Sequence, residues 1–217
     1  MNEPLFEIED FNKKCNKGLE TLIPRNEWVP EKEIQGTDEM VLNHPMMEKA
    51  FRRIVELFKP KHEIALVSLC TSTRPYSNSR KWKTFKNMFS NKVDLIICSN
   101  GGIIPIEFEN CYPYLTYDAH GNKKYDEMYI KKIYERLCIF FERHKYKKII
   151  FNFRPNLRNR ISALKFIDNH SDSNTKFYVL PSEEAYNKNK EEGYKLGMYF
   201  PDLYPNVLKE ISDAIYE

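Results

Sequence analysis

Four short apolar runs recur along this chain, and segments with helical character separate them. The runs EIALVSL, VDLIICS, KKIIFNF and KFYVLPS occupy residues 63–69, 93–99, 147–153 and 176–182. Each is typical of a buried strand, and the strand–helix–strand order favours parallel pairing. The alternation predicts an α/β fold, a three-layer sandwich around a mostly parallel sheet of four to five strands.

The segments around these runs carry the predicted helices. Apolar residues at three- and four-residue spacing predict an amphipathic helix at 46–58, which ends before Pro60. The other predicted helices are a basic segment at 79–89, a long amphipathic helix at 125–146, and helices at 157–170 and 204–216. Residues 103–124 contain two prolines and many aromatic residues without a clean period. We predict a long ordered loop there, and such loops are usually functional.

The first 43 residues differ from the rest of the chain. They are polar and mixed in charge, and they contain the helix and strand breakers Pro24, Pro30 and Gly36. These residues leave room for one short helix. We therefore expect an N-terminal extension at residues 1–43 and one α/β core domain at residues 44–217.

Composition excludes two broad classes of protein. With 41% hydrophobic and 14% aromatic residues, the chain is too apolar to be disordered. Its apolar runs fall short of the roughly 18 residues that a membrane span requires, so we expect no membrane association. The N-terminal sequence MNEPLFEIEDFNKK is acidic where a targeting peptide is basic and then apolar. These features predict a cytoplasmic protein.

Cysteine, histidine and net charge indicate no specific site. The five cysteines are an odd number without CxxC pairs, which favours free thiols over a disulfide framework. The cysteines and the five histidines do not sit at metal-ligand spacing, so we predict no metal and no other cofactor. The net charge of +3 is too mild to indicate nucleic-acid binding without a local basic patch.

Three loops follow the predicted strands, at residues 70–79, 99–118 and 152–160. In an open parallel sheet the ligand lies outside the carboxyl ends of the strands, where helix N-termini point inward. We therefore expect nucleophilic, acid–base and anion-binding groups to share one rim. These groups are the thiol of Cys70, the phenol of Tyr76, the hydroxyls of Ser77 and Ser79, the carboxylates of Glu107, Glu109, Asp118 and Asp126, and the guanidinium groups of Arg74, Arg154, Arg158 and Arg160.

Each of these groups also has a purely structural interpretation. Cys70 is either a small core residue or, if a helix N-terminus and Arg74 lower its pKa, a reactive thiolate. Pro75 and Tyr76 fit a simple turn with an aromatic ring packed on the sheet. The hydroxyls of the same loop fit a helix N-cap, and the glutamates and the basic helix fit a solvated surface.

The loop after the first strand and the segment after the second form a joint motif. The stretch HPMMEKAFRRIVELFKPKHEIALVSLCTSTRPYSNSRKW, followed by VDLIICSNGGIIPIEFENCYPYLTYDAHGNKKYDE, resembles the core domain of archaeosine synthase, an archaeal tRNA-modifying relative of tRNA-guanine transglycosylase. That family's motif runs Pro-Cys, three residues, Lys-Pro-Tyr, two residues, Ser, two residues, His. The positions in register are Cys70, Pro75, Tyr76, Ser79, Gly102, Pro105, Glu107, Glu109, Pro113, Tyr117, Asp118 and Asp126.

Some positions depart from the family motif. Leu69 occupies the position of the motif proline, Arg74 that of the lysine and Trp82 that of the histidine. Residues 99–102 are Ser-Asn-Gly-Gly where the family usually has Ser-Pro-Leu-Gly. Arg74 keeps the positive charge but cannot act as a neutral amine. Trp82 removes a titrating group and offers a stacking surface instead.

The resemblance implies a fold like that of uracil-DNA glycosylases, in which an Asp-Pro-Tyr turn after the first strand faces the extruded base. Arg74, Pro75 and Tyr76 would occupy that turn. It also implies that free lysine is added to the nitrile of 7-cyano-7-deazaguanine in tRNA, after which a partner radical enzyme completes the amidine in some lineages. Full-length family enzymes also carry a transglycosylase-like domain and a C-terminal RNA-binding domain, so a partner subunit or a basic patch of this chain would hold the tRNA.

Amine addition to a nitrile needs a deprotonated nucleophile, a hydrogen-bond donor to the nitrile nitrogen, and a pocket for an unstacked base. We expect Glu107 or Asp118 to accept the amine proton, Tyr76 or Ser79 to donate, and Cys70 to add covalently or to form a wall. The expected substrate-binding residues are Arg74, Pro75, Ser99, Gly102, Glu109 and Tyr117. The expected nucleic-acid contacts are Arg80, Lys81, Lys83, Arg154 and Arg158.

Two other functions fit the same sequence. One is a nucleic-acid base hydrolase or a DNA 7-deazaguanine modification enzyme, which would need a water-activating carboxylate near Tyr76. The other is a non-catalytic RNA-binding module that has lost the motif lysine and histidine. Arg74 and Trp82 separate these hypotheses, because both side chains pointing into the pocket would indicate altered family chemistry.

Overall fold

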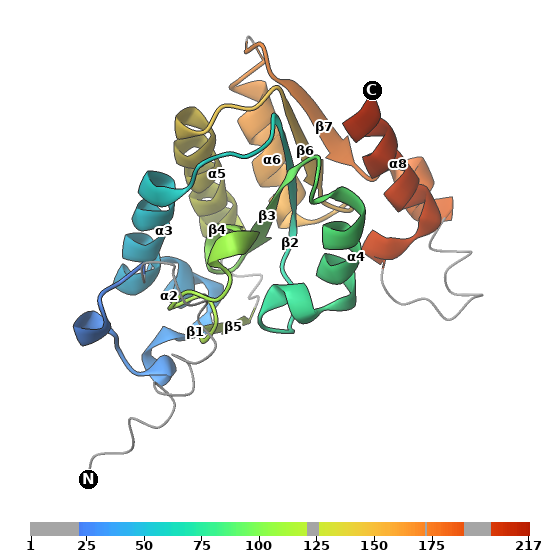
Figure 1. The fold of residues 1–217 in the computed structure, drawn as a ribbon. Helices are drawn as coiled ribbons and strands as arrows, with labels where there is room; N and C mark the ends of the chain where they lie inside the picture. Colours follow the sequence, from blue (N-terminus) through green and yellow to red (C-terminus); the bar gives the residue numbers. More distant parts are fainter. Residues whose placement is uncertain (1–21, 121–125, 172, 189–200) are drawn as a thin grey trace.

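A five-stranded sheet organises the chain (Figure 1). The structure is a computed structural model that describes residues 22–120, 126–171, 173–188 and 201–217. The strands, in the order β4-β3-β2-β6-β7, are Gly102–Pro105, Asp94–Ser99, Ile64–Leu69, Lys148–Asn152 and Lys176–Leu180. Neighbouring strands are parallel except β3 and β4. The prediction of a mostly parallel sheet of four to five strands is confirmed.

Helices cover both faces of this sheet. They are α3 (Pro45–Leu57), α4 (Arg80–Phe89), α5 (Asp126–Arg143), α6 (Arg158–Asp168) and α8 (Pro205–Tyr216). In Figure 1, α3, α5 and α6 lie on one side of the sheet, and α4 and α8 lie on the other. The helix ends predicted from the sequence lie within three residues of the observed ends. The α/β layering is confirmed, and the likeness to uracil-DNA glycosylases stays a prediction. No helix in the described part of the chain is long and apolar enough to cross a membrane.

The central strands are apolar on both sides because helices cover both of their faces. The Phe151 ring of β6 packs against Phe141 of α5 and Phe166 of α6, with ring centroids 6.2 and 5.9 Å apart. On α4, Trp82 and Phe85 are fully buried, and their rings meet edge to face. Apolar burial of this kind is the dominant favourable term in folding, and it explains why the strand sequences are nearly continuous apolar runs.

Residues 22–42 pack against this core. Strand β1 (Gln35–Thr37) pairs in parallel with β5 (Asp118–His120), and helix α2 (Asp38–Leu42) follows directly. Thr37 caps α2, because its hydroxyl accepts the N–H of Met40 at 3.4 Å. The side chains of Leu22, Ile23, Ile34, Val41 and Leu42 are buried in the same apolar cluster as the sheet. The division at residue 43 stays a prediction, and residues 1–21 lie outside the described part of the chain.

The segment predicted as one long ordered loop contains short strands. Within residues 103–120 the chain forms most of β4, a 3₁₀ turn at Ile106–Phe108 and the strand β5. Strand β4 lies at the edge of its sheet, where Pro105 is tolerated because one side of the strand needs no ladder hydrogen bonds. Residues 121–124 of the predicted loop lie outside the described residues.

We predict that Phe151→Ala lowers the free energy of unfolding by about 3–5 kcal/mol, because it removes a ring that packs against two helices and leaves a cavity. Ile161→Ala on α6 is the matched control, since this side chain is 52% exposed and should change stability by less than about 1 kcal/mol. Urea unfolding followed by circular dichroism measures both. Equal losses for the two variants would contradict the packing described here.

Candidate functional site

The carboxyl ends of β2, β3 and β6 meet at one edge of the sheet. These strands are parallel, and they end at Leu69, Ser99 and Asn152. The loops that begin at Cys70, Asn100 and Phe153 therefore leave the sheet side by side. The prediction that these three loops start at a common edge is confirmed.

Two phenols and a guanidinium group meet where the loop after β2 contacts Tyr117, the residue before β5. The hydroxyls of Tyr76 and Tyr117 are 2.7 Å apart, and both rings are buried. The Arg74 guanidinium lies 4.1 Å from the Tyr117 ring centroid and 5.4 Å from that of Tyr76. Burial raises the pKa of both phenols above the ordinary value, so both stay protonated at neutral pH. The sequence placed these three residues in one site, and the structure brings them into contact.

Cys70 follows β2 directly and lies near two cations. Packing around the thiol raises its pKa above the usual range, although Lys81 and Arg74 act in the opposite direction. Of the two interpretations of Cys70, the structure favours the core residue over the resting thiolate, because desolvation outweighs the nearby positive charges. The neutral thiol is the resting form at neutral pH.

The hydroxyl-rich loop is shaped by capping interactions. Ser79 is the N-cap of α4, and its hydroxyl accepts the N–H of Trp82 at 3.3 Å. The Ser77 N–H donates to the buried Glu109 carboxylate at 2.7 Å. Trp82 is fully buried in the core, so it offers no stacking surface to a base. The N-cap interpretation of this loop is confirmed, and a catalytic role for Ser79 stays a prediction.

The two carboxylates expected to accept a proton lie apart. Strand β4 runs antiparallel to β3 and returns the chain toward the amino ends of the strands, where Glu107 pairs with Lys61 just before β2. This placement differs from the expected rim shared with Cys70, because the sequence did not reveal the reversal. Asp118 is exposed on β5 and directly follows Tyr117. Asp118 therefore lies nearer the paired phenols along the chain.

The turn between β3 and β4 is built around a buried arginine. Arg136 of α5 donates to the carbonyl oxygens of Gly101 at 2.7 Å and Leu42 at 2.9 Å. Gly102 has φ +115°, and a Cβ there would lie 2.1 Å from Arg136 Nη1. Ser99 closes the turn by accepting the Gly101 N–H at 2.9 Å. Ser99 and Gly102, both expected to bind substrate, thus have clear structural roles in this turn.

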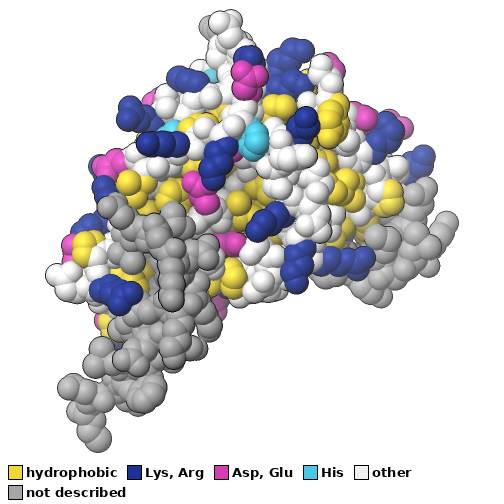
Figure 2. All heavy atoms as spheres, viewed as in Figure 1, with side chains coloured by type: hydrophobic (Ala, Val, Ile, Leu, Met, Phe, Trp, Pro, Cys, Tyr) yellow, Lys and Arg dark blue, Asp and Glu magenta, His cyan; other side chains and the backbone are white. Residues whose placement is uncertain are grey.

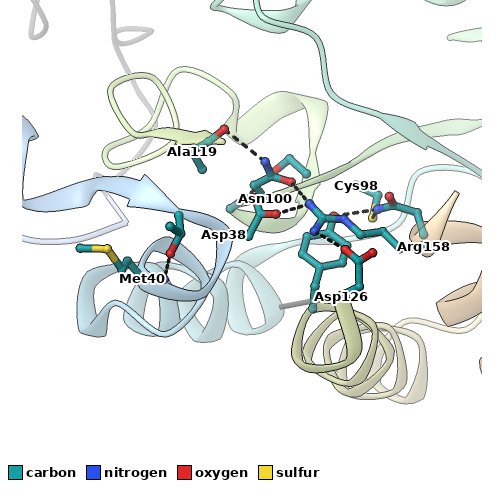
Figure 3. Close-up of polar contacts among 12 residues, drawn as sticks. Asp38, Met40, Cys98, Asn100, Ala119, Asp126 and Arg158 are labelled. Carbon is teal, nitrogen blue, oxygen red and sulfur yellow. Dashed lines mark hydrogen bonds and ion pairs between the residues drawn. The ribbon is translucent and has the colours of Figure 1, made fainter. Parts of the chain in front are cut away.

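Arg158, the first residue of α6, joins several segments at this edge (Figure 3). Its guanidinium forms an ion pair with the fully buried Asp38 of α2 and lies 3.1 Å from Asp126 at the start of α5. It also lies 3.4 Å from the Asn100 side-chain oxygen and 3.5 Å from the Tyr129 ring centroid. Arg158 is thus engaged by the protein itself, which differs from the expected contact with nucleic acid.

The remaining expected nucleic-acid contacts differ in exposure. Lys81 is buried, and its ammonium group lies 2.6 Å from the Leu69 carbonyl oxygen and 3.2 Å from Asp202. Arg80 and Lys83 are exposed on α4, and Arg154 is half-buried after β6. The structure leaves Arg80 and Lys83 as the expected contacts with the most accessible side chains.

Several buried polar atoms at this edge have no hydrogen-bond partner within the described structure. They include Arg74 Nε, Asp38 Oδ1 and Asn152 Oδ1. Buried polar groups are normally paired, because leaving one unpaired costs about 1–3 kcal/mol. A mixture of unpaired donors and acceptors at the ends of parallel strands is typical of a place where a polar ligand or water binds.

Sequence reasoning missed part of this edge. Asp38, Asn100 and Tyr129 all contact Arg158, and Asn159 donates to the Tyr129 hydroxyl at 2.8 Å. Asn100 was visible as the residue after a buried strand. Asp38 had no such signal, because it lies in the segment assigned to the N-terminal extension and reaches Arg158 only in three dimensions.

A family model described as "Domain of unknown function (DUF5591)" matches residues 47–185. The chain belongs to the DUF5591 family. The matched region contains the whole five-stranded sheet and the Arg74–Tyr76–Tyr117 cluster, whereas Asp38 lies outside it.

This DUF5591 protein is similar to other known proteins over part of its length. It is 23% identical over 129 residues to an archaeosine synthase from Haloferax volcanii, a match that covers 58% of this chain and 22% of the relative. The chain therefore spans about a fifth of that relative's length. The crystal structure of AF0587, a protein of unknown function, matches 69% of this chain and 49% of its own with 19% identity and a TM-score of 0.48.

We predict that Asp38→Asn lowers the free energy of unfolding by about 3 kcal/mol, because it removes a buried carboxylate that is paired with Arg158. Asp213→Asn is the matched control, since Asp213 is 61% exposed in its pair with Lys209 on α8 and should cost under about 1 kcal/mol. Chemical denaturation measures both values. If Asp38→Asn were as stable as the control, the ion pair would not anchor residues 35–42.

We also predict that Cys70 is alkylated slowly at neutral pH. A raised pKa means less thiolate at a given pH than the roughly 3% expected for an ordinary thiol at pH 7, so the rate should keep rising above pH 8.5. Iodoacetamide labelling from pH 6 to 10, with peptide mass spectrometry, measures this profile. The same peptide labelled in urea is the control and should show the ordinary profile. A native half-maximum below pH 8 would contradict the account.

Proposed function

We propose that this protein acts on a 7-deazaguanine base of tRNA and holds the base at the carboxyl edge of the sheet. The observation that carries the proposal is the set of buried, unpaired polar atoms at that edge, which also holds the Arg74–Tyr76–Tyr117 cluster. The partial similarity to an archaeosine synthase supports tRNA as the substrate class.

A guanine-like base suits the groups at this edge. Such a base presents N–H donors and a carbonyl acceptor, while the protein offers Asn152 Oδ1 and Asp38 Oδ1 as acceptors and Arg74 Nε as a donor. An extruded base loses its stacking and pairing at a cost of a few kcal/mol, and new hydrogen bonds and aromatic contacts offset that cost. The Tyr117 ring, already covered by Arg74, forms one wall of this site.

We propose amine addition to a nitrile as the reaction, with free lysine as the amine donor. The amine nitrogen bonds to the nitrile carbon, one π bond of the nitrile becomes a lone pair on nitrogen, and a proton moves from the amine to that nitrogen. The hydrogen bond between Tyr76 and Tyr117 uses one phenol proton, and the proton of the other hydroxyl is suited to donate to the nitrile nitrogen as it gains charge. Asp118 is the better placed of the two predicted proton acceptors, because Glu107 is paired with Lys61.

Cys70 offers a covalent alternative to direct addition. Its sulfur would bond to the nitrile carbon, and its proton would pass to the nitrile nitrogen, giving a thioimidate. The amine would then displace the thiol, so that Cys70 regains its proton and the product is the same amidine. Lys81 and Arg74 would stabilise the thiolate during either step, although the resting thiol is neutral.

A second candidate is a non-catalytic module that binds a modified tRNA. Two observations favour it: the Cys70 thiol has a raised pKa, and Trp82, which stands for the motif histidine, is sealed in the core. This candidate uses the same edge of the sheet and predicts binding without a change in the base.

The test is mass spectrometry of a tRNA bearing 7-cyano-7-deazaguanine after incubation with the protein and lysine. We expect an adduct with the mass of lysine, formed roughly 10²-fold more slowly by Tyr76→Phe, because a donor to the developing charge is lost. Tyr216→Phe is the matched control, since this tyrosine is 65% exposed on α8 and should act like the unaltered protein.

The other outcomes separate the alternatives. A Cys70→Ala variant that keeps full activity would leave direct addition as the route. Binding of the tRNA without an adduct would favour the non-catalytic module. Release of the free base would favour a hydrolase, and neither binding nor reaction would overturn the proposed function.

A further inference from the structure

A groove separate from the carboxyl edge lies between α4 and the segment from Pro105 to Asn110, and it reaches the amino ends of β2 and β3. It has a volume of about 530 Å³ and is lined by Lys86 and Ser90 of α4, by residues that lead into β2 and β3, and by Glu107 and Glu109. This volume lies within the range of about 300–1,000 Å³ that is typical of small-molecule sites. The groove is therefore large enough for one nucleoside.

The exposed side of α4 carries a stripe of cations that leads to this groove. Arg80, Lys83 and Lys86 are spaced three residues apart and are all exposed. In the described part of the chain, none of the three forms an ion pair within 4 Å. Like charges at this spacing destabilise a helix slightly, so their clustering indicates a role outside folding. Figure 2 shows Lys and Arg side chains over and around α4.

The stripe runs from the loop of the candidate base site to the groove. Arg80 follows the N-cap Ser79, which closes the loop of Cys70 and Tyr76, whereas Lys86 lines the groove. Six residues of helix separate Arg80 from Lys86, a rise of about 9 Å. A ligand lying along α4 would thus reach from the candidate base site to the groove.

We propose that a single strand of RNA lies along α4, with its phosphates on Arg80, Lys83 and Lys86 and a neighbouring base in the groove. This inference rests on the proposed function for the choice of RNA and extends it to nucleotides that flank the modified base. Positively charged tracks with adjacent base sites are the usual way in which proteins hold single strands.

The chemistry of the groove favours an RNA base over an acidic peptide. Glu107 and Glu109 line the groove and would repel carboxylates, whereas a carboxylate accepts hydrogen bonds from base amino groups. Phe58 and Ile106 supply apolar surface, and Lys86 adds a donor. The Glu109 carboxylate also holds the Ser77 N–H, so a base in the groove would lie next to the loop that forms the first site.

The test is the salt dependence of binding to a fluorescent, unmodified tRNA transcript. The double variant Lys83→Glu/Lys86→Glu should bind at least about tenfold more weakly, and its slope of log affinity against log salt should shrink by about 1.4, or about 0.7 for each phosphate that is no longer neutralised. Lys131→Glu is the matched control, because this lysine is exposed on α5, on the other side of the sheet. It should leave affinity and slope close to those of the unaltered protein.

A second variant tests the groove itself. Ser90→Trp places a large side chain at its exposed rim and should weaken binding without changing the salt slope. If the unaltered protein binds the transcript and the α4 double variant binds like Lys131→Glu, the RNA track is wrong and the proposed function stands. If the unaltered protein neither binds the transcript nor modifies tRNA, both proposals are overturned.

Discussion

The burial of the central strands on both faces is the constraint on which the rest of this structure depends. Strand β2 lies between β3 and β6, and helices cover both sides of the sheet. Polar groups are excluded from most of these strands, so hydroxyls, amides and charges collect where the strands end. The Arg74–Tyr76–Tyr117 stack and the Arg158 ion pairs are both consequences of that displacement, and they leave unpaired donors and acceptors at one edge.

Arg74 gives the two phenols a cationic neighbour that stays charged. Its guanidinium is planar and stacks on Tyr117, whereas a lysine amine at this position could lose its proton. Under the proposed function, this group would bind and polarise the base, and the proton acceptor would be a different residue. We therefore propose that Arg74 and the tyrosines recognise the base, whereas a carboxylate such as Asp118 transfers the proton.

Local patterns predicted the fold better than the site. The buried strands and the helices were predictable because apolar runs and helical periodicity are properties of neighbouring residues. Strands β1 and β5 were missed because each has three residues and depends on a partner distant in the sequence. Strand β4 was missed because it has only four residues, although it pairs with the adjacent β3. The same limit explains Lys81 and Arg158, which look like surface cations in the sequence but pair with the distant Asp202 and Asp38. The raised pKa of Cys70 likewise depends on packing that the sequence does not show.

The most direct test of the account is a titration of the ¹⁵N-labelled protein with the free base 7-cyano-7-deazaguanine, followed by NMR. If the base binds between the loops that leave the carboxyl edge of the sheet, amide shifts will concentrate at residues 70–79, at 99–102 and at the end of β6. Shifts confined to other parts of the molecule, or no shifts at millimolar base, would contradict the central claim that this edge is a base-binding site.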